Sequence, residues 1–168
     1  GFQGQRFMYE LLYDGKGKLD AWNARYKDTG PPLYAQAHCL PPGMPGVMQQ
    51  PYPIDIAYQP GRVTIYTEAY QQTRWIYTDR RALPEDPDEF FNGTSVGHWE
   101  GDVLVVDTVG LNDPTWVDNA GIPHTKNLHV VERWKKINGG KQLEVRITLD
   151  DPAVFTRPWT ARRVFDWS

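Results

Sequence analysis

The sequence predicts one domain, built mainly from an antiparallel β-sheet of about eight strands in meander order that closes into a barrel. Three observations favour this fold class. Apolar and polar residues alternate with a period of two from Ile54 onward, short turns with glycine or proline separate the alternating segments, and few segments have helical periodicity. Because so little helix is available to cover an open sheet, closing the sheet would remove its exposed edges. A two-sheet β-sandwich is the alternative.

The N-terminal part, residues 1–53, is predicted to be an irregular, proline-rich segment that wraps the sheet. Residues 7–13 fit a short helix or strand, and residues 19–26 fit a short helix. From 30 to 53, proline and glycine are too frequent for long regular elements. The sheet follows over 54–165, and no linker or repeat divides the 168 residues into two domains.

Turn signals mark the ends of the expected strands. Pro60-Gly61 ends the first strand, and Gly101-Asp102 fits the type II′ turn of a two-residue hairpin. Asn138-Gly139-Gly140 joins the sixth strand to the seventh. We expect strands at 54–58, 62–68, 73–78, 95–100, 103–108, 128–137, 142–150 and 160–165, with long loops at 83–92 and 110–127.

Composition and charge exclude several classes of protein. A net charge of −3 and a pI near 5.8 argue against a nucleic-acid partner. No apolar run approaches the roughly 20 residues of a membrane helix, so we expect no membrane partner. The single cysteine, Cys39, excludes a disulfide framework and a cysteine-based zinc site. The sequence contains no phosphate loop and no Rossmann fingerprint, and we expect no cofactor.

The hairpin around Gly101-Asp102 concentrates ionisable groups. On a strand, His98 and Glu100 point to one side and Trp99 to the other. Asp107 shares a face with two valines, so burial could raise its pKa and make it a usable acid or base. In the simpler interpretation, Asp107 accepts hydrogen bonds from loop backbone while His98 and Glu100 form a solvated pair.

A second group of ionisable residues lies in the 110–127 loop, which also holds Trp116. Asp118 and His124 belong to it, and loops often carry functional side chains. His129 and Glu132 follow, but their opposite parity on a strand keeps them apart, so the spacing fails as a zinc motif. We predict no metal site, and an all-protein site would require His98, His124 or His129 to meet through folding.

A third group consists of Glu68, Arg74 and Tyr77. Glu68 ends one expected strand and Arg74 begins the next, so an ion pair across the connection is the simpler interpretation. The alternative is that Arg74 and Tyr77 hold a substrate oxyanion while Glu68 or Tyr77 exchanges a proton.

Several strings resemble a family of uncharacterised, mostly exported bacterial proteins. They are RWIYTDRRALP, SVGHWEGDVLVVDTVG, GIPHT with LHVVERW, and TLDDPAVFTRPW, in that order between Cys39 and Trp159. The chain departs from the family pattern where Arg80 replaces a glycine and Gly46 replaces an arginine. The resemblance implies a periplasmic or secreted protein and supplies no reaction. The G-x-W-x-G-D-x-L pattern is also similar to lipocalin-like (calycin) barrels, an analogy of fold alone.

The preferred functional hypothesis is a cofactor-independent acid–base enzyme, such as a lyase, hydratase, isomerase or cyclase. It would act on a small molecule in a pocket at the barrel mouth, capped by the 110–127 loop. His124 would transfer the proton, oriented by Asp118 or Asp107, with His98 as the second acid or base. The residues expected to bind substrate are Arg74, Tyr77, Glu68, Trp99 and Trp116.

Two other classes stay open. A non-catalytic carrier of an apolar or aromatic molecule predicts a pocket lined by residues such as Tyr66, Trp75 and Trp99, without a converging acid or base. A structural or assembly protein predicts a large apolar surface at a subunit contact, and a homo-oligomer would fit that class. The enzyme hypothesis requires His124 to face a pocket within reach of a carboxylate.

Overall fold

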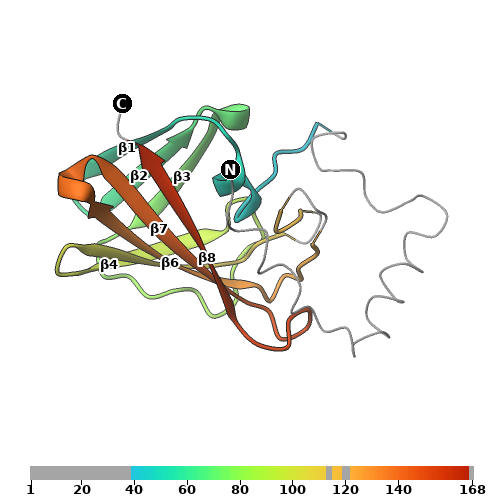
Figure 1. Cartoon of the computed structure of the whole chain (residues 1–168). Helices are drawn as coiled ribbons and strands as arrows, with labels where there is room; N and C mark the ends of the chain where they lie inside the picture. The colour runs from blue at the N-terminus through green and yellow to red at the C-terminus, as the bar shows by residue number, and fades with distance from the viewer. Residues whose placement is uncertain (1–38, 113–114, 119–121, 167–168) are drawn as a thin grey trace.

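Eight strands form one sheet in sequence order, as the alternation pattern predicts (Figure 1). The computed structural model describes residues 39–112, 115–118 and 122–166, so the elements expected at 7–13 and 19–26 lie outside the described residues. The strands are β1 (Ile54–Gln59), β2 (Arg62–Thr67), β3 (Gln72–Tyr77), β4 (Thr94–Glu100), β5 (Val103–Val109), β6 (His129–Ile137), β7 (Gln142–Asp150) and β8 (Trp159–Asp166). The described helical turns are short 3-10 segments: η3 (Gly46–Gln49), η4 (Ala69–Gln71) and η5 (Asn138–Gly140).

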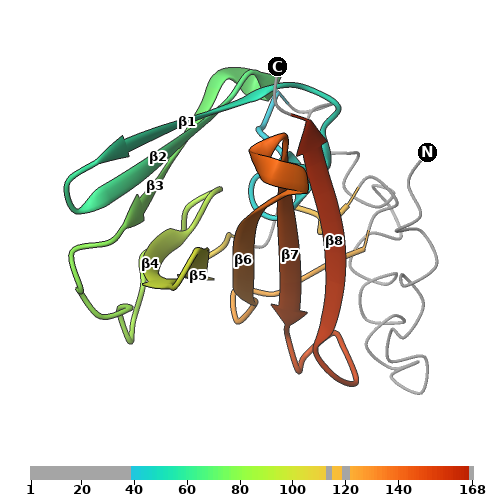
Figure 2. The same ribbon diagram turned by 60° about the vertical axis from the view of Figure 1, so that its left-hand side comes forward.

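The sheet curls into an open half-barrel, whereas the sequence predicts a closed barrel. In the described sheet β1 and β8 are the two edges, and each pairs with one neighbour. Figure 2 shows β1–β3 and β6–β8 on two sides, with β4 and β5 between them. All neighbours are antiparallel except β3 and β4, which pair in parallel at Ile76–Ser95 and Tyr77–Val96.

Period-two alternation separates a concave inner face from a convex outer face. On β7, Val145, Ile147 and Leu149 are buried on the inner face. On β5 the inner face carries Leu104 and Val106. Directly opposite residues of neighbouring strands share a face, so the registers extend this inner face across the sheet.

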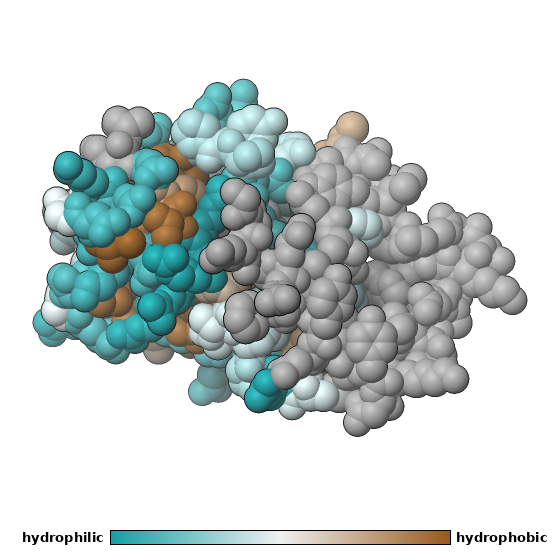
Figure 3. Space-filling model, in the orientation of Figure 1, coloured by the Kyte–Doolittle hydropathy of each residue, from teal (hydrophilic) through white to brown (hydrophobic). Residues whose placement is uncertain are grey.

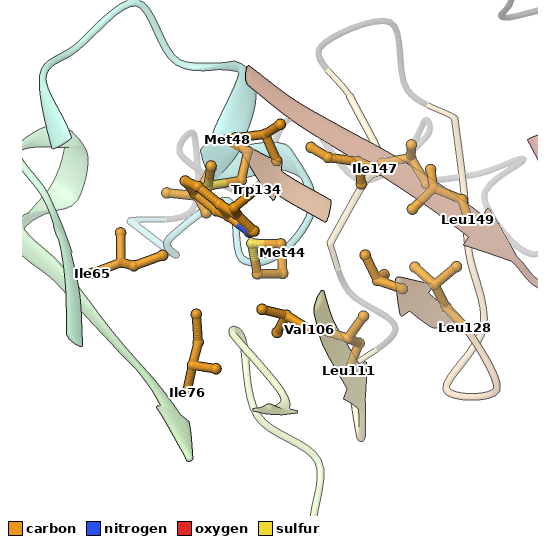
Figure 4. Packing of buried hydrophobic residues seen from close by; sticks show 14 of the residues in the cluster. Met44, Met48, Ile65, Ile76, Val106, Leu111, Leu128, Trp134, Ile147 and Leu149 are labelled. Atoms are coloured by element: carbon orange, nitrogen blue, oxygen red, sulfur yellow. The ribbon is translucent and has the colours of Figure 1, made fainter. Parts of the chain in front are cut away.

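The proline-rich segment 39–50 packs into the concavity. Met44, Val47 and Met48 are almost fully buried and belong to the same hydrophobic core as the inner-face residues, as Figure 4 shows for Met44 and Met48. Arg163 on β8 donates from Nη1 to the Gln49 carbonyl at 3.1 Å and from Nη2 to that of Gln50 at 2.9 Å. The sequence predicts that residues 1–53 wrap the sheet. The described residues 39–50 instead pack against its concave face.

The surface of the described residues is mainly hydrophilic in the view of Figure 3, with smaller hydrophobic areas between the polar ones. Among these residues, no helix has the length and the apolar character that a membrane crossing requires.

Candidate functional site

An ion pair between Arg74 and Glu132 is buried inside the half-barrel. Arg74 lies on the inner face of β3 and Glu132 on that of β6, and the two residues are 5% and 0% exposed. Arg74 Nη2 donates to Glu132 Oε2. Because buried charges are costly without a partner, this pair must form for either residue to occupy the core.

Two hydroxyl groups complete the environment of the guanidinium. Arg74 Nε donates to Ser95 Oγ on β4 at 3.1 Å, and Nη2 donates to Thr108 Oγ1 on β5 at 2.8 Å. The two hydroxyls are 2.9 Å apart and hydrogen-bond to each other. Arg74 Nη1 also lies 3.5 Å from the thioether sulfur of Met44. The guanidinium thus connects four strands with the segment that fills the concavity.

Two buried polar atoms on the inner face of β6 have no hydrogen-bond partner among the described residues. They are Oε1 of Glu132 and Nε1 of Trp134. Both residues lie on the inner face of β6, and Trp134 is 4% exposed. Buried polar groups are nearly always hydrogen-bonded, so an unpartnered acceptor and an unpartnered donor two residues apart on one strand face are unusual. We call Arg74, Ser95, Thr108, Glu132 and Trp134 the buried polar cluster.

The third group of sequence candidates does not converge. Arg74 pairs with Glu132 instead of the expected Glu68, which is exposed at the end of β2. Tyr77 lies on the outer face of β3, where the Arg81 guanidinium stacks on its ring at 3.6 Å. The Arg74 guanidinium is therefore occupied by protein groups and is not arranged with Tyr77 as an oxyanion holder.

His124 is buried in the loop between β5 and β6. Its Nδ1 lies 3.0 Å from the Thr125 carbonyl oxygen, which can only accept, so Nδ1 carries a proton. Nε2 lies 2.8 Å from the Thr115 hydroxyl, which also donates to the Asn112 carbonyl at 3.1 Å. Asp118 is also buried, and its Oδ1 accepts from the Ile122 amide at 3.4 Å.

Two described parts of this loop, 115–118 and 122–124, pair with each other and pack against the core. Trp116 forms an isolated bridge with Pro123, and the Val117 amide donates to the Ile122 carbonyl at 2.8 Å. Gln49 Nε2 donates to the Val117 carbonyl at 3.0 Å, which ties the loop to η3. Asp118 and His124 therefore lie near the segment that fills the concavity.

His98 and Asp107 lie on the outer face, away from the concave core. The exposed His98 Nε2 is 3.3 Å from Glu100 Oε1, as the simpler interpretation expects. Arg133 donates to Glu100 Oε2 at 2.6 Å, and this bond, with a smaller part from His98, lowers the pKa of Glu100. Asp107 pairs with the part-exposed His129 at 3.0 Å.

The aromatic candidates are also divided between the faces. Trp75 and Tyr66 lie on the outer face, and the Trp75 ring has the Arg62 guanidinium 5.2 Å from its centroid. Trp99 has the inner-face parity of Leu104 but is half-exposed at the end of β4. Of the residues expected to line a carrier pocket, only Trp99 shares the face of the core.

Sequence reasoning missed the buried polar cluster apart from Arg74. The sequence does contain a signal for this cluster. On β6 the charged Glu132 lies between the apolar Val130 and Trp134, at a position of the same strand face where an apolar residue is expected. Arg74 likewise precedes Ile76 on an apolar face. Two opposite charges at core positions of different strands indicate a buried pair.

The described residues contain no group of three or more His, Cys, Asp or Glu side chains arranged to hold a metal ion. No family model, curated protein or solved structure matches the chain.

Proposed function

We propose that the protein binds a small, uncharged organic molecule on the concave side of the half-barrel, at the buried polar cluster. The observation that carries this proposal is the pair of unpartnered buried atoms, Glu132 Oε1 and Trp134 Nε1. A polar atom without a partner in the core loses the free energy of its hydration, on the order of 1–3 kcal/mol. A ligand that hydrogen-bonds to both atoms would recover that loss.

The charges of the cluster favour a neutral ligand. The positive charge of Arg74 and the negative charge of Glu132 cancel within the pair, and Ser95 and Thr108 are neutral. A charged ligand would enter the core without a counter-charge, which is strongly unfavourable. The surrounding inner-face side chains, such as Val106 and Ile147, are apolar and suit an apolar ligand body.

The likeness to lipocalin-like barrels agrees with this role, since small barrels commonly hold one small ligand. In this proposal the segment 39–50 takes the place of the additional strands that would close such a barrel. The ligand would enter between this segment and the inner face of the sheet, where Met44 now contacts Arg74.

Thermal unfolding with simple probes tests the proposal. We expect the neutral probe phenol to raise Tm, toluene, which lacks a hydroxyl, to raise it less, and benzoate and benzylammonium at equal concentration to leave it unchanged. Thr108→Val, an isosteric change inside the cluster, should reduce the phenol shift. Thr73→Val, the same change on the exposed outer face of β3, should not. An equal or larger shift with the charged probes, or none with the neutral ones, would contradict the proposal.

A second candidate function is the acid–base chemistry expected from the sequence, with His124 as the proton-transfer group. The contact that favours it is the 2.8 Å pair of His124 Nε2 with the Thr115 hydroxyl, in a ring whose Nδ1 bonds to a carbonyl. This role requires the ring to change its charge in the folded protein. NMR titration of the His124 Cε1 proton checks it: a ring that stays in one charge state from pH 5 to 9 would rule the role out.

A further inference from the structure

We infer that the ligand of the buried polar cluster is an alcohol or a phenol, recognised through a single hydroxyl group. This inference rests on the proposed function and names the ligand class of the same site. The ligand hydroxyl would donate its proton to Glu132 Oε1, and its oxygen would accept from Trp134 Nε1. The rest of the ligand would lie against the apolar inner face.

The hydrogen-bonding capacities of the two atoms select the hydroxyl. A carboxylate oxygen only accepts and an indole N–H only donates, so the ligand must supply one donor and one acceptor. A carbonyl or ether could serve Trp134 and would leave Glu132 Oε1 unpartnered. An ammonium could serve Glu132 alone and would add a charge to the core. A hydroxyl is the smallest uncharged group with both capacities.

The positions of the two residues allow one oxygen to serve both. Glu132 and Trp134 are two residues apart on the same face of β6, so their Cα atoms are about 7 Å apart. One bridging oxygen with hydrogen bonds of about 2.8 Å on each side spans most of that separation. Both side chains are long enough to converge over the remainder.

The residues directly opposite define the body of the ligand. Val106 on β5 and Ile147 on β7 flank Glu132, while Leu104 and Val145 flank Trp134. All four are buried members of the core, and none can hydrogen-bond through its side chain. The site therefore offers polar contacts to one group of the ligand and apolar contacts to everything else.

Met44 is the side chain that the ligand would displace. It is fully buried, its sulfur lies 3.5 Å from Arg74 Nη1, and in the view of Figure 4 it lies between Trp134 and Val106. Methionine is flexible and adapts to different shapes, so its side chain can take another rotamer within the core when a ligand enters. Its removal by Met44→Ala should leave a cavity beside Trp134 and the Arg74 guanidinium and tighten probe binding.

Phenol and toluene form a matched pair of probes, because they differ only by hydroxyl against methyl. We expect equilibrium dialysis of the full chain to give phenol a dissociation constant at least about tenfold below that of toluene, since a hydrogen bond to a charged group is involved. Trp134→Phe should remove most of this preference. Trp75→Phe, the same change on the outer face, should keep it.

A spectroscopic measurement on the wild-type chain avoids dependence on a variant that fails to fold. With 15N-labelled tryptophan, seven indole N–H signals are expected from the seven tryptophans. Phenol should move one of them strongly, because a new hydrogen bond forms at Nε1, and toluene should not.

The possible outcomes distinguish the hydroxyl inference from the proposed binding function. Equal binding of phenol and toluene would overturn the hydroxyl inference and leave the proposed function standing. Binding of neither probe, as expected if a tightly held water or nothing occupies the cluster, would overturn both. A phenol preference that survives Trp134→Phe unchanged, or no shifted indole signal, would overturn the role of Trp134.

Discussion

Arg74 on β3 and Glu132 on β6 form a buried ion pair inside the half-barrel, although 58 residues separate them in the sequence. Each charge is buried only because the other is present. The pair therefore joins the β1–β3 side of the half-barrel to the β6–β8 side through side chains, across a sheet whose edge strands do not meet. This relationship makes the pair a determinant of stability as well as part of the candidate site.

Removing one member of the pair should be far more costly than replacing both. We expect Glu132→Ala to lower the free energy of unfolding by about 3–5 kcal/mol, because it leaves Arg74 charged, buried and unpaired. The double variant Arg74→Met with Glu132→Leu, which leaves no buried charge, should lose less than Glu132→Ala alone. Urea unfolding at pH 7 measures both. If the double variant is the less stable of the two, the pair stabilises the fold beyond compensating its own burial.

Met44 should contribute strongly to stability although it lies in a proline-rich, irregular segment. Its side chain is fully buried in the core, so Met44→Ala should cost about 2–5 kcal/mol. Leu40, which precedes it in the same segment, is exposed, and Leu40→Ala should change stability by no more than about 0.5 kcal/mol. Equal urea midpoints for the two variants would mean that residues 39–50 do not pack into the core.

The strands could be predicted because their signal is local. Alternation and turn residues such as Gly101-Asp102 depend on neighbours in sequence, and the structure has its strands within a few residues of those expected. The parallel pairing of β3 with β4 has no such signal, because it depends on the path of the irregular chain between Tyr77 and Thr94. Closure of the sheet also has no local signal, because it depends on whether the first and last strands meet in space.

The candidate site was harder to predict because its contacts are between distant strands. A period-two pattern places Arg74 and Glu132 on one face each, but it does not say which strand faces which across a concavity. Proximity in sequence favours Glu68 as the partner of Arg74, and the curl of the sheet brings Glu132 instead. The gathering of ionisable groups near one turn favours His98 and Asp107 as site residues, whereas the sheet places them on its outer face.

A close approach between Gly43 and Phe91 should make Gly43 sensitive to substitution. Gly43 has φ +64, and a Cβ there would lie 2.4 Å from the Phe91 carbonyl oxygen, which accepts the Met44 amide at 2.8 Å. Gly101 has nearly the same φ, +61, with nothing near its position for a Cβ. Alanine at either site bears the strain of a positive φ, about 1–2 kcal/mol. Gly43→Ala should cost about 1–3 kcal/mol more than Gly101→Ala, because the clash adds to the strain.

Thermal and urea unfolding of the two glycine variants measure that difference directly. Both substitutions add one methyl group at a positive φ, so strain and unfolded-state effects largely cancel between them. Equal losses in the free energy of unfolding would show that residues 43 and 91 are not in contact in solution. The proline-rich segment would then not pack against the 78–93 connection.

Glu144 on β7 should make the fold less stable in acid. It accepts from Arg162 Nε on β8 and from Arg146 Nε at 3.0 Å, and these two arginines face each other directly across the strands. Like charges opposite one another are unfavourable, so the carboxylate compensates for their repulsion. The hydrogen bond from Arg162, followed by that from Arg146, lowers the pKa of Glu144 below its usual 4.5.

The lowered pKa of Glu144 determines how stability changes with pH. Because the pKa is lower in the folded than in the unfolded chain, the stabilisation is complete above pH 4.5 and disappears as the pH falls through the folded value. We therefore expect Glu144→Gln to destabilise the protein at pH 7 and to flatten the loss of stability between pH 5 and pH 3. Urea unfolding at several pH values measures both curves. Parallel curves for the variant and the wild type would show that Glu144 has the same pKa in the folded and unfolded chains, and that Arg146 and Arg162 do not hold its charge.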